Sequence, residues 1–109
     1  MAKNIQALTL GNALSEHGRE QLTAWLVGNK TGGARLRAGL PAGWRVGDKT
    51  GSGERGTAND VGVAWPPQSP PILIAVYHAV YLTGTAANAE ARNRTIAAVG
   101  GAIAARLRG

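Results

Sequence analysis

The sequence predicts an α+β fold: an antiparallel three-stranded sheet with a C-terminal helix packed on it, preceded by two N-terminal helices. Strand-like runs bounded by turn residues occupy the middle of the chain, and apolar residues at helical spacing occupy both ends. A chain of 109 residues, 44% of them hydrophobic, suffices for one domain with a modest core. We expect a helical part at 1–40, three strands at 41–84 and the last helix at 85–109.

The N-terminal part is expected to form two helices. The first covers residues 4–14 and is interrupted by a glycine, which weakens it. Ser15 is placed to cap the second helix, and Gly28 is placed to end it. Apolar residues at i, i+3 and i+4 define its packed side: Leu22, Trp25 and Leu26. A short helical turn is expected at 34–38, before the first strand.

The middle of the chain reads as a hairpin followed by a third strand. The first two strands are expected at 44–52 and 57–65, joined by a tight connection at 53–56. A proline-rich stretch at 66–71 must turn, because proline lacks the amide donor that a strand needs. The third strand starts at Ile72.

The third strand contains an imperfect tandem repeat, in which Ala75-Val76-Tyr77-His78 is followed by Ala79-Val80-Tyr81-Leu82. An even-numbered duplication keeps the same side-chain face buried on both sides of it. The repeat would lengthen the strand to about twelve residues, beyond the usual range. We therefore expect a bulge, an overhang or a displaced loop, with one long strand as the alternative.

The last helix is expected over residues 86–107, across one face of the sheet. Gly100 and Gly101 lower its helix propensity, unless they allow close packing against a strand. Four residues form its apolar stripe: Ile96, Val99, Ile103 and Leu107. The other tryptophans, Trp44 and Trp65, lie on separate elements and are expected in the core or an interface.

Charge and composition argue against several classes of function. The net charge is +6, but the basic residues are scattered and no aromatic series accompanies them, so neither nucleic acid nor a membrane is an expected partner. The chain has no cysteine. His17 and His78 lack further ligands at metal spacing, so we expect no metal and no cofactor. The glycines at 51–56 lack the Gly-Lys-Ser/Thr signature and following helix of a phosphate loop.

The stretch from Val46 to Gly53 reads as a strand with a cation, a hydroxyl and two glycines at its end. Such an edge presents N–H groups and Lys49 to an anionic or carbonyl-bearing ligand, and glycine allows close approach. The alternative is a lysine that merely ends a hairpin strand.

The run from Leu40 to Gly56 closely resembles the segment that leads into the third active-site motif of class A serine β-lactamases. In that family the Lys-Thr-Gly strand faces a Ser-x-x-Lys nucleophile motif and a Ser-Asp-Asn motif. The resemblance extends over about residues 5–107 and implies part of the β-lactamase/transpeptidase-like fold, here a single incomplete domain corresponding to the C-terminal portion of the enzyme. The related penicillin-binding transpeptidases share a Lys-Thr-Gly strand and are a further alternative.

The resemblance implies roles for four consecutive residues. Lys49 and Thr50 would bind the carboxylate of a β-lactam, and Gly51 would let the substrate lie along the strand. The backbone N–H of Ser52 would serve as a catalytic oxyanion-hole donor.

Arg35 corresponds to an arginine that, in a subset of the family, replaces one on the next strand, where this chain has Ala58. Arg35 is therefore a second candidate for carboxylate recognition. The alternative for Arg35 is a solvated arginine on a short helix, and Arg37 is expected to be structural or on the surface.

No nucleophile motif occurs in the sequence. The three serines are followed three places later by Gly18, Arg55 and Ile72, so Ser-x-x-Lys is absent, as is Ser-Asp-Asn. We expect a β-lactam hydrolase fragment, related to antibiotic resistance, that is inactive alone. Its expected partners are the substrate in the completed enzyme and a complementing N-terminal fragment, or self-association through an exposed sheet edge. The alternative is a stand-alone binding module that reuses the fold.

The localisation is inferred from the apolar segments of the sequence and from the family resemblance. The sequence starts without the apolar stretch of a signal peptide and has no run long enough to span a membrane. The resemblance implies a periplasmic or secreted protein.

Overall fold

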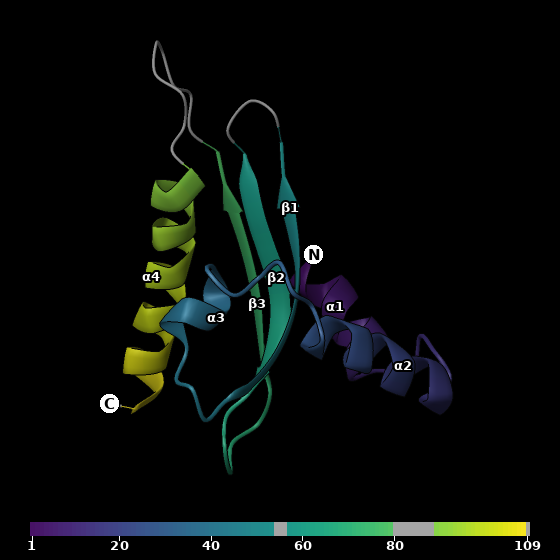
Figure 1. Ribbon diagram of the computed structural model, residues 1–109. Coiled ribbons are helices and arrows are strands. Elements are labelled where there is room, and N and C mark those ends of the chain that lie inside the picture. The colour runs from purple at the N-terminus through teal and green to yellow at the C-terminus, as the bar shows by residue number, and fades with distance from the viewer. Residues whose placement is uncertain (54–56, 80–88, 109) are drawn as a thin grey trace.

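A three-stranded antiparallel sheet lies at the centre of the molecule, with helices on both of its faces (Figure 1). The computed structural model describes residues 1–53, 57–79 and 89–108. The strands β1 (Arg45–Ser52), β2 (Ala58–Trp65) and β3 (Ile72–His78) pair in the order β1-β2-β3. This confirms the predicted α+β fold. Residues 80–82 of the tandem repeat, on which the expected bulge, overhang or displaced loop depends, lie outside the described residues.

One face of the sheet is covered by α3 (Leu36–Gly39) and α4 (Ala89–Arg108), and we call it the closed face (Figure 1). Side chains alternate along a strand, so the even-numbered residues of all three strands point to this side. The buried core of the closed face comprises Leu36, Leu40, Val46, Ala58, Ala64, Ile74, Ile96 and Ala104. Most of the apolar burial is therefore on this side.

The glycines of α4 allow it to approach α3 closely. A Cβ on Gly100 would lie 2.8 Å from the Leu36 carbonyl oxygen, and a Cβ on Gly39 would lie 2.7 Å from the Gly101 nitrogen. Both separations are shorter than real Cβ contacts, so neither glycine can carry a side chain without a shift of the backbone. We expected the Gly100-Gly101 pair to allow close packing against a strand. The partner is instead the helix α3.

The opposite face carries α1 (Ala2–Thr9) and α2 (Glu16–Val27), and we call it the open face (Figure 1). The Ser15 hydroxyl accepts a hydrogen bond from the Gly18 N–H at 3.1 Å, which confirms the predicted N-cap. The helix α2 packs on β1 where Gly47 has no side chain, since a Cβ there would lie 3.0 Å from the Leu26 Cβ.

Two apolar side chains are more exposed than the periodicity predicts. Trp25 is 68% exposed on α2, and Leu107 is 56% exposed near the end of α4. Other residues of the same apolar stripes make the packing contacts, Leu26 in α2 and Ile96 in α4. The described residues therefore cover only part of each stripe.

The first helix is also shorter than expected. It ends at Thr9, and the Leu10 and Gly11 N–H groups both donate to the Gln6 carbonyl. The helix does not continue because glycine at position 11 has a low helix propensity. Within the described residues, no helix is long and apolar enough to cross a membrane.

Candidate functional site

The end of β1 is an edge of the sheet, and its pairing exposes the backbone there. Gly53 N–H donates to the Thr57 carbonyl at 3.0 Å. Amides alternate in direction along an antiparallel ladder, so the Ser52 N–H points to the side of β1 away from β2. Ser52 is exposed. An N–H on a free, exposed edge can be donated to a ligand, as the sequence predicts for this residue.

Lys49 and Thr50 lie on opposite faces of β1 beside this edge. The Lys49 side chain is exposed, and its Nζ donates to the Thr50 carbonyl at 2.6 Å. The Thr50 hydroxyl lies 2.6 Å from the Thr31 hydroxyl. Thr31 is in turn held by Asn29, whose Oδ1 accepts from the Thr31 N–H and hydroxyl at 3.2 and 2.9 Å. The cation is thus accessible, while the hydroxyl has a fixed neighbour.

Arg35 is buried and bound to both strands. Its Nη1 donates to the carbonyls of Gly51 and Asn59 at 2.9 and 2.8 Å, and its Nη2 donates to the Ser52 Oγ at 2.6 Å. Its Nε donates to Asn93 Oδ1 on α4 at 2.9 Å. Four of the five guanidinium N–H groups are therefore used, and Arg35 is 9% exposed. The alternative of a solvated arginine is wrong.

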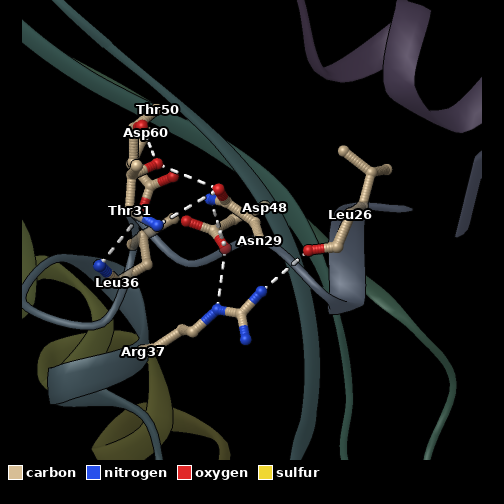
Figure 2. Close-up of polar contacts among 8 residues, drawn as sticks. All are labelled: Leu26, Asn29, Thr31, Leu36, Arg37, Asp48, Thr50 and Asp60. Carbon is tan, nitrogen blue, oxygen red and sulfur yellow. Dashed lines mark hydrogen bonds and ion pairs between the residues drawn. The ribbon is translucent and has the colours of Figure 1, made fainter. Parts of the chain in front are cut away.

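A second polar cluster lies behind the motif, on the closed face (Figure 2). Asp48 is fully buried, and its Oδ1 accepts from Arg37 Nε at 2.7 Å and from Asn29 Nδ2 at 3.3 Å. Arg37 Nη2 also donates to the Leu26 carbonyl at 2.8 Å. Arg37 therefore has a structural role, joining α2, α3 and β1.

Asp60 of β2 is the second buried carboxyl of this cluster (Figure 2). Its Oδ2 accepts from the Leu36 N–H at 3.1 Å. Burial raises the pKa of Asp60 to about 8, and a hydrogen bond with Asp48 and the charge of Asp48 act in the same direction. Oδ2 of Asp48 and Oδ1 of Asp60 are buried without a hydrogen-bond partner among the described residues.

No group of three or more His, Cys, Asp or Glu side chains that could hold a metal occurs in the described part of the chain. The buried aspartates have an arginine and amides as neighbours, which is a structural arrangement rather than a ligand set. The chemistry that the β1 edge can offer is therefore the binding of an anion and of a carbonyl oxygen.

Comparison with known proteins identifies the kind of site. A family model described as "Beta-lactamase enzyme family" matches residues 1–107. The chain belongs to the class A β-lactamase family. An ancestral (GNCA) class A β-lactamase structure matches with a TM-score of 0.87 and 53% identity, over 97% of this chain and 39% of that one.

Two curated β-lactamases give the same result. The β-lactamase OXY-1 of Klebsiella oxytoca is 49% identical over 98 residues, which is 90% of this chain and 32% of the relative. A β-lactamase of Proteus vulgaris is 56% identical over 77 residues, 71% of this chain and 28% of the relative. The chain thus spans about a third of the length of these relatives.

The structure brings together all five residues that the sequence predicts for a β-lactamase site. Arg35 contacts Gly51 and Ser52 directly, and Lys49 and Thr50 are adjacent on the same edge. The buried pair of Asp48 and Asp60 was not predicted as part of any site. A signal was present, because aspartate is depleted in strands and the only two aspartates of the chain both lie in strand-like runs.

Proposed function

We propose that this chain forms the substrate-carboxylate and oxyanion-hole wall of a class A serine β-lactamase, which hydrolyses the β-lactam amide. The observation that carries the proposal is the exposed β1 edge, where an exposed lysine, a hydroxyl and an outward N–H lie within four residues, at Lys49, Thr50 and Ser52. The membership of the β-lactamase family supports the reaction class.

Each residue of the edge has a chemical role in acyl transfer. Lys49 and Thr50 supply a positive charge and a hydroxyl for the carboxylate of the substrate. The Ser52 N–H stabilises the negative oxygen that develops when the carbonyl carbon becomes tetrahedral. Gly51 has no side chain to obstruct a substrate that lies along the strand.

Arg35 supports this wall in two ways. Its bonds to the carbonyls of Gly51 and Asn59 hold the ends of β1 and β2 together. Its charge adds to that of Lys49 from the other face of β1, which favours a carboxylate at the end of this strand. Contact with the substrate would run through the remaining Nη2 N–H, next to the Ser52 hydroxyl.

We propose further that the attacking serine lies outside these 109 residues, because the sequence contains no Ser-x-x-Lys motif. The nucleophile would belong either to another segment of the same polypeptide or to a complementing fragment. The chain by itself is then inactive. Among the residues that the structure describes, the outer edges of β1 and β3 are unpaired, and together with the open face they offer the contact surface for this missing part. A periplasmic or secreted location follows the family.

The test is hydrolysis of a chromogenic β-lactam by the chain alone and by the chain mixed with the remaining portion of a class A β-lactamase. We expect turnover only in the mixture. Lys49→Ala should lower kcat/KM of the mixture by about 10²-fold, the scale of removing one preorganised electrostatic group. The matched control Lys30→Ala removes another exposed lysine and should change little. Turnover by the chain alone, or equal effects of the two substitutions, would refute the proposal.

A further inference from the structure

The two aspartates behind the motif form a buried diagonal pair. Asp48 is opposite Gly62 in the β1–β2 register, and Asp60 is opposite Thr50, so both carboxyls point to the closed face from neighbouring strands. Both residues are 0% exposed. Gly32 leaves room beside the pair, since a Cβ there would overlap the Asp48 carboxyl group. The site is built around the carboxyl groups and is closed to water.

Two negative charges at such a distance from water are unfavourable. A like charge disfavours ionisation of its neighbour, and burial disfavours the charged form of each carboxyl. One oxygen on each group also has no hydrogen-bond partner, which costs free energy for a buried acceptor. A single proton between the two unpartnered oxygens would remove both difficulties.

We propose that Asp60 is a positioning residue whose carboxyl stays protonated and donates a hydrogen bond from Oδ1 to Oδ2 of Asp48. The assignment of the proton follows from the other partners. Asp48 faces the guanidinium of Arg37 and the amide of Asn29, which favour a carboxylate. Asp60 accepts only from the backbone N–H of Leu36 through its other oxygen.

The charged groups around the pair agree with this assignment. Arg37 is bound to Asp48, and Arg35 donates its hydrogen bonds to Gly51, Asn59, Ser52 and Asn93 rather than to Asp60. On the same face, β3 contributes His78, opposite Ala58, and α4 contributes Arg92, whose Nε is buried. The raised pKa of Asp60 reflects burial and Asp48, which outweigh the opposing effects of Arg35 and the Leu36 N–H.

The shared proton would fix the motif strand from behind. Asp48 immediately precedes Lys49, and Asp60 is the register partner of Thr50. The pair connects α3 through Leu36 and Arg37 to β1 and β2. The idea that the pair positions Lys49 and Thr50 for a substrate rests on the proposed function. The protonation of Asp60 does not depend on that function.

The proton can be observed directly, because Asp48 and Asp60 are the only aspartates of the chain. The carboxyl ¹³C signals of the aspartate-labelled chain should therefore give two resonances, one for each aspartate. We expect one resonance to keep the chemical shift of a protonated carboxyl between pH 5 and pH 7, and to disappear in Asp60→Asn. Ionisation of both aspartates by pH 5, or a protonated signal that persists in Asp60→Asn, would overturn the proposal.

The positioning role is tested by amide hydrogen exchange at Lys49 and Gly51, whose N–H groups point toward β2. Asparagine can donate to Asp48 and accept from the Leu36 N–H, so Asp60→Asn should retain the protection of the unsubstituted chain. Asp60→Ala leaves the Asp48 oxygen unpartnered and should lower that protection by about tenfold or more. Equal protection in the two variants would rule out the role. Neither the carboxyl signals nor the amide exchange requires β-lactam hydrolysis. A failure of the proposed function can therefore be told apart from a failure of this proposal.

Discussion

The two faces of the sheet differ in how completely this chain covers them. On the closed face, α3 and α4 bury an apolar core together with two aspartates, of which Asp48 forms an ion pair with Arg37. On the open face, α1 and α2 bury Ile5 and Leu26 but leave most of Trp25 in contact with solvent. The exposed Lys49 also points to the open side of β1.

This difference suggests a division of roles, in which the closed face stabilises the fold and the open face provides a contact surface. The closed face positions β1 from behind through Arg35, Arg37 and the aspartates. The open face presents apolar surface and an exposed cation, which are features of a contact surface rather than of a finished core. Four predictions test this division.

The largest effect is expected from a cavity in the closed face. Ile96 is fully buried between α4 and the sheet. Ile96→Ala should lower the free energy of unfolding by about 2–5 kcal/mol, measured by urea denaturation. Leu107→Ala, on the exposed part of the same helix, should change it by less than about 0.5 kcal/mol. A small effect of Ile96→Ala would show that the closed face is not the stable part.

A steric change at the helix contact should have the next largest effect. In Gly39→Ala the new methyl group would overlap the Ala97 carbonyl oxygen and push α3 away from α4. We expect a loss of about 1–3 kcal/mol in the same denaturation measurement. Gly43 has open space around it, so Gly43→Ala serves as the matched control. Equal stability of the two variants would contradict the close approach.

The closed face should also make stability depend on pH. The folded state keeps a proton on Asp60, whose pKa is about 8, while the unfolded state releases it near 3.8. The folded state binds more protons in this interval, so the unfolding free energy falls as pH rises, and the fall ends above about pH 8. We expect a decrease of about 1.4 kcal/mol between pH 6 and pH 7. Denaturation curves of Asp60→Asn should lack this decrease; an unchanged slope would contradict the linkage.

The smallest change in stability is expected on the open face. Trp25→Ser removes the largest exposed apolar side chain and should alter the unfolding free energy by less than about 0.5 kcal/mol. We predict that the unsubstituted chain self-associates and that Trp25→Ser raises the monomer fraction in sedimentation velocity. Leu107→Ser removes a comparable exposed side chain from the other layer and should not. The reverse pattern would assign the association to α4.

Local signals were sufficient for the elements and for the motif strand. The cap at Ser15, the glycine stop after α2 and the hairpin of β1 and β2 all depend on neighbouring residues, and their bounds follow the predictions closely. The predicted site residues gather at one edge because four of them are consecutive.

The remaining features depend on contacts between distant segments. The partner of Gly100 is α3, and nothing in its own sequence neighbourhood indicates this. Helical spacing places Trp25 on an apolar stripe but does not show which part of the stripe is covered. The sharing of a proton by Asp48 and Asp60 requires the register of two strands, which a sequence pattern alone does not provide.

The hydrogen bond from Arg35 to Asn93 connects residues 58 positions apart and has a consequence for synthesis on the ribosome. The helix α4 is translated after all three strands, so Leu36 and Ile74 have no cover until that helix has emerged. Until then, the apolar closed face of these strands is uncovered. This interval is when a holding chaperone would be most useful to the growing polypeptide.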